Sequence, residues 1–224
     1  MKNFIQTLDR YIIATTGMFL SAVGIAMTIV SNLGTSPLSC PSYVLNLRVP
    51  SVSVGTFTLL VNCLYVLIQI LLLRRQFRLA DLLQIVASAI FGYMIDIALS
   101  TMGWLHPVRL VDKIGLNVAS CLISAFGVSL EVAARAWMLS AEMTAAALAK
   151  VLGREFSTMK IAMDCSVVAI SAALAMAFFG NPLGDGSSYV IGIGTALSAV
   201  LIGLFMRLTD PLVSRLLPSR YQGS

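Results

Sequence analysis

Six apolar runs of bilayer-spanning length follow one another along the chain, separated by short polar or basic segments. A transmembrane helix needs about 20 mostly apolar residues. The runs that meet this length are Tyr11–Ser31, Val54–Leu73, Leu79–Thr101, Ile114–Arg135, Ser157–Phe179 and Ser188–Leu208. The pattern therefore predicts an all-α, polytopic membrane protein with six transmembrane helices.

Two further apolar stretches, Ser36–Leu47 and Ser140–Val151, are too short to cross a bilayer. Segments of this length suit short half-helices, which either re-enter the membrane or lie in its interface. The sequence leaves these two alternatives open.

The pattern occurs twice, in about residues 11–101 (repeat A) and about residues 114–208 (repeat B). Matching positions follow in the same order: Ser21-Ala22-Val23-Gly24 with Ser124-Ala125-Phe126-Gly127, Asn62-Cys63 with Asp164-Cys165, and Gly92 with Gly203. Because each repeat has an odd number of spans, repeat B must enter the membrane from the opposite side, which gives an inverted 3+3 repeat. The alternative is a chance similarity, since small residues are common in membrane helices.

Composition agrees with a membrane protein. Apolar residues make up 58% of the 224 residues and charged residues only 11%, whereas soluble domains carry about 25% charged residues. The length suits a single transmembrane domain over residues 1–224. The net charge of +5 is spread among loops and forms no basic cluster with aromatics, so we expect no nucleic-acid partner.

Basic residues are distributed unequally between the two sides that six spans would create. One side receives only Arg48, Arg109 and Lys113. The side with both termini receives Lys2, Arg10, Arg74, Arg75, Arg78, Arg135, Lys150, Arg154, Lys160, Arg207, Arg215 and Arg220. By the positive-inside rule, we expect both termini to be cytoplasmic.

Residues for enzyme chemistry are scarce. The four cysteines, which show no CxxC spacing, are Cys40, Cys63, Cys121 and Cys165. We expect neither a metal site nor a cofactor. Ser, His and Asp residues do not form a catalytic set, because the single histidine, His106, lies in an interfacial loop beside Trp104. The sequence therefore predicts a protein that is not an enzyme.

The starts of the two short stretches carry candidate substrate-binding residues. The first follows Asn32-Leu33-Gly34-Thr35-Ser36-Pro37, in which Ser36 can cap a helix that begins at Pro37. A half-helix starting at membrane depth points free N–H groups at a polar or anionic solute, so Asn32, Thr35 and Ser36 are candidates. The alternative is an ordinary turn before a surface helix. In repeat B, Ser140 would cap and Glu142 would lie in the first turn.

Polar residues inside the spans give further candidates, because they are costly in a bilayer unless they have a partner or line a cavity. Asn62 and Asp164 occupy matching positions, and Thr195 matches Gln84. We expect Asn62, Asp164 and Thr195 to contribute to substrate binding, and Asp164 and Asp96 to take a proton or coupling ion. A structural ion pair of Asp164 with Lys160 is the alternative. For Glu131 and Arg135, an intrahelical pair is expected.

Several of these motifs together resemble the YczE/YyaS/YitT-type bacterial membrane proteins. They are Asn32 to Pro37, Ser53-Val54-Gly55-Thr56 leading to Asn62, Gly92 with Asp96, and Ile191-Gly192-Ile193-Gly194-Thr195. The similarity extends from about Tyr11 to Leu208. It implies a multi-pass protein of the bacterial inner membrane and transfers no ligand or catalytic residues.

The function that fits a duplicated membrane unit best is transport of a small solute through a site near the midplane, between the two repeats. The alternative is a non-transporting membrane scaffold, assembly factor or regulator. The expected partners are the lipid bilayer and an unknown small solute, and a homodimer stays open.

Overall fold

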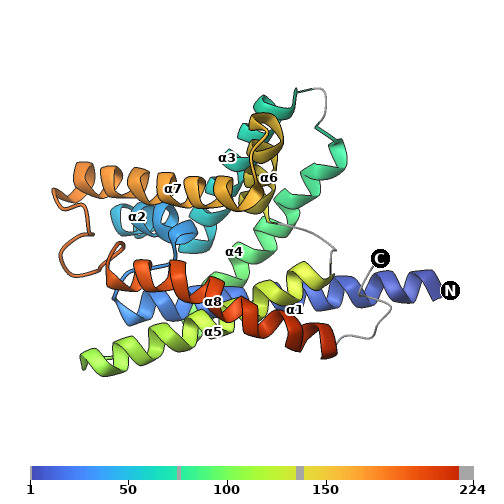
Figure 1. The fold of residues 1–224 in the computed structure, drawn as a ribbon. Coiled ribbons are helices and arrows are strands. Elements are labelled where there is room, and N and C mark those ends of the chain that lie inside the picture. Colours follow the sequence, from blue (N-terminus) through green and yellow to red (C-terminus); the bar gives the residue numbers. More distant parts are fainter. Residues whose placement is uncertain (1, 75–76, 135–138, 217–224) are drawn as a thin grey trace.

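The computed structural model in Figure 1 describes residues 2–74, 77–134 and 139–216, and in these ranges all regular structure is helical. The helices are α1 (Lys2–Ser31), the 3₁₀ turn η1 (Pro37–Ser39), α2 (Cys40–Arg48), α3 (Val54–Leu73), the 3₁₀ turn η3 (Leu79–Leu82), α4 (Leu83–Thr101), α5 (Leu110–Ala134), α6 (Ser140–Leu152), α7 (Phe156–Phe179) and α8 (Ile193–Leu216).

Six of these helices are long and apolar enough to cross a membrane, which confirms the predicted all-α polytopic fold. The spans are Asp9–Ser31, Val54–Leu73, Leu83–Thr101, Leu110–Ala134, Thr158–Phe179 and Ile193–Arg215. Two predicted starts are too early. Leu79–Leu82 forms a 3₁₀ turn, and residues 188–192 form a loop in which Val190 donates its N–H to the Leu183 carbonyl, 2.8 Å away.

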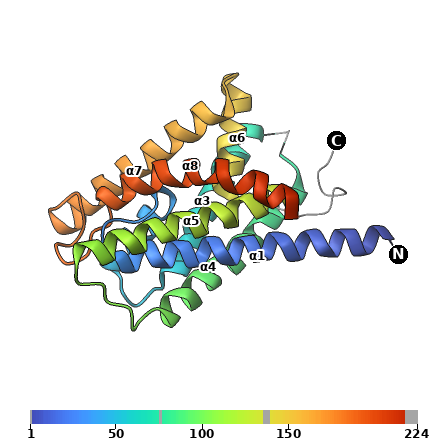
Figure 2. The same ribbon diagram turned by 60° about the horizontal axis from the view of Figure 1, so that its bottom comes forward.

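The helices form two layers. In the first layer α4, α1, α5 and α8 lie side by side in that order, and Figure 2 shows α1, α5 and α8 together. In the second layer α3, α6, α7 and α2 pack in a ring, each against the next. The layers are joined chiefly through α3, which packs against α4.

The short helices lie toward opposite ends of this arrangement. We call the end where α1 begins and α8 ends the terminal face, and the other end the opposite face (Figure 1). Helix α2 follows the end of α1 and lies toward the opposite face, whereas α6 follows the end of α5 and lies toward the terminal face. Each connects two spans of the same repeat.

The closest helix crossing is between α1 and α5, and small residues make it possible. A Cβ added to Gly127 would lie 2.6 Å from the Gly17 carbonyl oxygen and 2.7 Å from the Ser21 amide nitrogen. A Cβ added to Gly24 would collide with the Ser124 hydroxyl. Ser21 of α1 thus meets Gly127 of α5, and Gly24 of α1 meets Ser124 of α5. The contacts are reciprocal, because Gly127 matches Gly24 and Ser124 matches Ser21 in the sequence.

Candidate functional site

The beginnings of the two short helices approach one shared apolar cluster. Tyr65 of α3, Ala141 and Ala145 of α6, and Met163 of α7 belong to this cluster, and Leu38 of η1 packs against it. Tyr65 lies near the middle of its span. Both short helices therefore start inside the bundle, which favours the re-entrant alternative over a helix on the membrane surface.

The predicted cap is confirmed in position at the first short helix, without its side-chain hydrogen bond, and is wrong at the second. Ser36 takes the N-cap position of η1, but its hydroxyl bonds to the Ser39 hydroxyl at 2.9 Å instead of capping the backbone. In repeat B the N-cap is Leu139, and Ser140 is the first helical residue. Glu142 does lie in the first turn of α6, where a carboxylate complements the helix dipole.

Near the opposite face, the Asn32–Pro37 motif packs against the loop before α8. The Asn32 side chain donates to the Ser187 carbonyl at 2.9 Å and accepts the Tyr189 N–H at 2.7 Å. The Val190 carbonyl accepts the Thr35 N–H at 2.9 Å and the Thr195 hydroxyl at 3.3 Å. The structure thus brings Asn32, Thr35 and Thr195 together, and their polar atoms hold this loop in place.

The same loop is ordered further by Asp185. Its slight burial alone would raise the carboxyl pKa, but hydrogen bonds from the Ser188 N–H and from the Ser187 hydroxyl and N–H outweigh it and lower the pKa below its ordinary value. This carboxylate is therefore committed to the loop.

At the start of α6, buried amides and hydroxyls join three helices. Gln69 of α3 and Gln84 of α4 exchange amide hydrogen bonds of 3.2 and 3.0 Å. The Gln69 amide also donates to the Ser140 carbonyl and the Thr144 hydroxyl, both at 3.0 Å, while the Ser88 and Ser140 hydroxyls lie 3.2 Å apart. This network fixes α6, which belongs to repeat B, onto α3 and α4 of repeat A.

The network predicts a non-additive pair of substitutions. Gln69→Leu alone should destabilise the fold by about 1–3 kcal/mol, because it leaves the Gln84 amide buried without its partner. Gln69→Leu combined with Gln84→Leu should cost less than the sum of the two single variants, because both partners are then apolar. Unfolding free energies of the three variants in detergent micelles test this. Simple additivity would contradict the paired-amide interpretation.

Charged side chains gather beside this network. The Lys160 Nζ lies 3.0 Å from Asp164 Oδ1 and 3.9 Å from Glu142 Oε1, and both carboxylates interact electrostatically with Tyr65. Glu142 Oε2 is buried without a hydrogen-bond partner among the described residues. The Lys160–Asp164 pair that we considered as an alternative is therefore present, and it is linked through Lys160 to Glu142.

Glu131 extends this charged region toward α1. Its carboxylate accepts the Ser21 hydroxyl at 2.9 Å and interacts electrostatically with Glu142. Its expected partner, Arg135, lies outside the described residues. In the part of the chain that the structure describes, no three His, Cys, Asp or Glu side chains are placed to hold a metal ion.

Asn62 and Asp96 lie apart from these groups. Asn62 is buried on α3 one helical turn before Tyr65, and no described hydrogen bond joins it to Asp164. Asp96 of α4 accepts the Ser53 hydroxyl at 2.6 Å and the Gly55 N–H at 2.8 Å, so it caps the beginning of α3. The predicted residues therefore form two groups, one near the opposite face and one near the terminal face. Asn62 lies between the two ends of α3.

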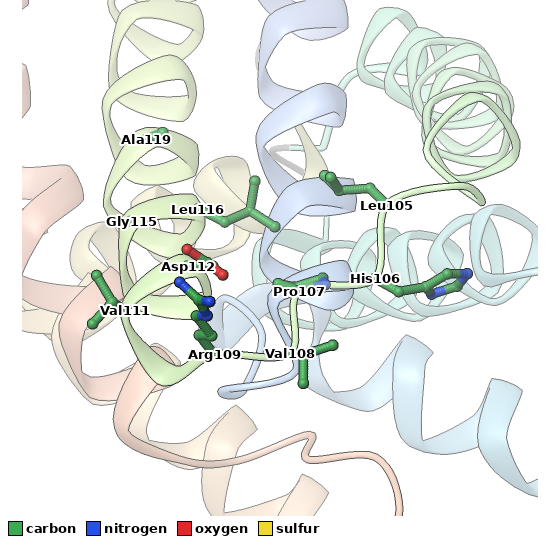
Figure 3. A pocket seen from close by; sticks show the side chains of 10 residues that line it. All are labelled: Leu105, His106, Pro107, Val108, Arg109, Val111, Asp112, Gly115, Leu116 and Ala119. Carbon is green, nitrogen blue, oxygen red and sulfur yellow. The ribbon is translucent and has the colours of Figure 1, made fainter.

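The two most prominent surface grooves lie elsewhere. One, of about 710 Å³, is formed by the α4–α5 loop and the first turns of α5 (Figure 3). The other, of about 410 Å³, lies on α1 beside Met94. Neither is lined by a predicted site residue, so the candidate site rests on the polar groups inside the bundle.

Sequence analysis missed Gln69, Ser88 and Thr144, although Gln84 was noted as a polar residue of the third span. An uncharged polar residue in an apolar span is itself a signal of a buried partner. The pairing could not be foreseen, because it joins residues of α3, α4 and α6 that only the fold brings together.

Comparison with known proteins places the chain in a family. The model of the family of unknown function DUF6198 matches residues 8–211. The chain belongs to this family. It is also similar to the uncharacterized protein YyaS of Bacillus subtilis (strain 168), with 26% identity over 211 residues that cover 92% of this chain and 94% of the relative. No solved structure matches the chain.

Membership in DUF6198 confirms the resemblance to YyaS-type proteins that the motifs indicated. The match covers the first five spans, both short helices and most of the sixth span. The descriptions of DUF6198 and YyaS assign no activity.

Proposed function

We propose that this protein is an inner-membrane carrier for a small polar solute, with its site where the two short helices begin. The observation that carries this proposal is the approach of η1 and α6, from opposite ends of the bundle, to one cluster on α3 and α7. Secondary transporters commonly bind substrate between discontinuous helices of two inverted repeats.

An inverted repeat would account for how the helices pack. The contact of α1 with α4 corresponds to that of α5 with α8, and the contact of α3 with α6 corresponds to that of α7 with α2. A two-fold axis through the α1–α5 crossing generates such reciprocal contacts, including Gly24 with Ser124 and Gly127 with Ser21. The axis would lie in the membrane plane.

The charged group suits a solute with polar or cationic functions. Glu142 and Asp164 share one lysine, and one Glu142 oxygen has no described partner, so this group can accept a donor from a solute. Tyr65 lies on the α3 face that packs toward α6 and α7, and Asn62 is buried one helical turn before it. In this proposal Asp164 and Glu142 contact the solute, and Lys160 offsets one of their two negative charges in its absence.

The proposal includes an orientation. Basic residues described on the terminal face include Arg10, Arg74, Arg78, Lys150, Arg154, Lys160, Arg207 and Arg215. Among the basic residues that the structure describes, only Arg48, Arg109 and Lys113 lie at the opposite face. By the positive-inside rule, the terminal face is cytoplasmic.

Uptake into proteoliposomes tests the function. We expect the wild-type protein to accumulate at least one solute from a panel of cationic, zwitterionic and neutral polar compounds under a proton or sodium gradient. Asp164→Asn should lower the initial rate by about tenfold, the size expected for losing one charge-assisted hydrogen bond. Asp112→Asn, at the other end of the bundle, is the matched control and should retain the wild-type rate.

A non-transporting scaffold is the second candidate, and one observation favours it. The space between the beginnings of the short helices is filled by Tyr65, Met163 and Val167, and neither prominent groove reaches it. A scaffold would move no solute in the panel under any gradient and would co-purify with a partner in stoichiometric amount. Uptake by the wild type with loss in Asp164→Asn would exclude this alternative.

A further inference from the structure

One pair of helices breaks the correspondence between the repeats. Helices α3 and α4 pack closely, whereas their counterparts α7 and α8 share no comparable packing. The difference also appears in burial, since 39% of the span window is buried in α4 and only 17% in α8. The other packed pairs described above have a counterpart in the second repeat, so this difference is local.

The α3–α4 contact has two ends: the Gln69–Gln84 pair joins the helices near the terminal face, and four other residues join them near the opposite face. Gly55 and Gly92 touch so closely that a Cβ on either one would collide with the carbonyl oxygen of the other. Next to them, Asp96 accepts hydrogen bonds from the Ser53 hydroxyl and the Gly55 N–H. We call this set the α3–α4 gate.

The repeat places four matching residues at the terminal face. Since Asn62 matches Asp164, Ser53 matches Glu155 and Gly55 matches Ser157. Backbone geometry agrees, because Ser53 and Glu155 are the N-caps of α3 and α7, with φ/ψ of −67°/157° and −64°/142°. On α8, Gly203 matches Gly92 and Arg207 matches Asp96. We call Glu155, Ser157, Gly203 and Arg207 the α7–α8 gate.

In this structure Glu155, Gly203 and Arg207 of the α7–α8 gate do not form the contact that the α3–α4 gate forms. A Cβ on Gly203 would meet no described atom within 4 Å, whereas one on Gly92 would strike backbone. Glu155 and Arg207 are both exposed, and the structure records no ion pair between them. Helices α3 and α4 are therefore in close contact near the opposite face, whereas α7 and α8 make no corresponding contact near the terminal face.

The chemistry of the second gate differs from the first in a specific way. Where repeat A uses a carboxylate with a hydroxyl and an N–H, repeat B offers the Glu155 carboxylate and the Arg207 guanidinium. An arginine can bind a carboxylate through two parallel hydrogen bonds, and small residues at 157 and 203 would let the two helices approach. Opposite charges at two matching positions are what a closing contact requires.

We propose that α7 and α8 close at the terminal face through a Glu155–Arg207 ion pair, with Ser157 against Gly203, while the α3–α4 gate opens. The proposal rests on the carrier function proposed above and names the two gates of its alternating access. The present structure is then the state in which the α3–α4 gate is packed and the α7–α8 gate is not. In the other state each repeat would take the conformation that its counterpart has here, so that α7 and α8 pack together and α3 and α4 separate. Such an exchange gives alternating access in transporters with inverted repeats.

Disulfide cross-linking in native membranes tests the gates without a known solute. The two cysteines that are not buried, Cys63 and Cys165, are first replaced by alanine. A disulfide forms only when the two Cα atoms come within about 7 Å. We expect mild oxidation to cross-link Ser157→Cys with Gly203→Cys, a pair that keeps Glu155 and Arg207, and separately Ser53→Cys with Asp96→Cys. The control, Glu155→Cys with Thr101→Cys, joins opposite faces and should remain reduced.

The coupling of the gates is tested in the same background. Asp96→Ala removes the hydrogen bonds of the α3–α4 gate and should raise the rate of Ser157→Cys/Gly203→Cys cross-linking several-fold, whereas Asp112→Ala should leave it unchanged. Glu155→Cys with Arg207→Cys is a second pair, in case the first variant folds poorly; folding is checked by elution as a single species in detergent.

The outcomes separate this inference from the transport proposal. If neither terminal-face pair cross-links while Ser53→Cys/Asp96→Cys does, α7 and α8 do not close and the inference is wrong. If Asp96→Ala leaves the rate of terminal-face cross-linking unchanged, the two gates are independent of each other, and this result would also overturn the inference. Gate closure in a protein that moves no solute would leave the inference intact and contradict the carrier function alone.

Discussion

The substitution Gly92→Ala should destabilise the protein by about 1–3 kcal/mol or more, whereas Gly203→Ala at the matching position of repeat B should be neutral or stabilising. On α4 the new methyl group would strike the carbonyl oxygen of Gly55, and backbone atoms cannot rotate away. On α8 it would enter open space. Alanine is also favoured over glycine in a helix by about 1 kcal/mol, which favours the α8 variant.

Thermal unfolding of both variants in the same detergent measures the difference. The comparison is matched, because the substitution, the helix position and the repeat register are the same. Equal losses of stability would mean that α7 and α8 also pack closely in solution. Equal gains would mean that the Gly55–Gly92 approach does not occur, and the proposed α3–α4 gate would have to be abandoned.

The architecture could be predicted because apolar length alone determines where helices can cross a bilayer. Two starts were misplaced for local reasons. Leu79–Leu82 is apolar but forms a 3₁₀ turn, and residues 188–192 continue an apolar pattern while Val190 bonds to the preceding loop and accepts from Thr35. Hydropathy does not register such tertiary hydrogen bonds, so span boundaries were less certain than span number.

The candidate site was predictable in part. Asn32, Thr35 and Thr195 do come together, yet they stabilise the loop before α8 rather than lining a cavity. Asp164 forms an ion pair with Lys160, which lies one helical turn earlier on the same helix. The sequence could not show that Gln69 binds the start of α6, because that contact joins the two repeats across about 70 residues of chain.

Asp96 has a different role in the structure from the one that its sequence position indicates. An aspartate inside an apolar span suggested a proton or ion site. In the structure both carboxylate oxygens accept hydrogen bonds from the first residues of α3. Because its counterpart is Arg207, the two repeats differ in charge where they differ in packing. The contacts that differ between the two repeats are therefore the ones in which we expect function to reside.

The α1–α5 crossing gives the second large effect, and its two halves should respond differently to rescue. Gly24→Ala and Gly127→Ala should each destabilise the fold by about 1–3 kcal/mol, because both place a methyl group against the facing helix. At Gly24 the nearest atom is the Ser124 hydroxyl oxygen, and the Ser124 Cβ and Ser120 carbonyl lie at 3.1 and 3.0 Å. Ser124→Ala should therefore restore most of the stability lost in Gly24→Ala.

Gly127→Ala should not be rescued in this way. The new methyl group would lie 2.6 Å from the Gly17 carbonyl oxygen and 2.7 Å from the Ser21 nitrogen, so Ser21→Ala removes only one of three close atoms. Gly115→Ala, on the same helix with open space around it, is the control and should retain full stability. Rescue of both variants, or of neither, would show that α1 and α5 cross differently from the arrangement described. Rescue of Gly24→Ala alone would support this crossing as the rigid centre about which the two repeats are related, since its backbone contacts leave no room for the helices to slide.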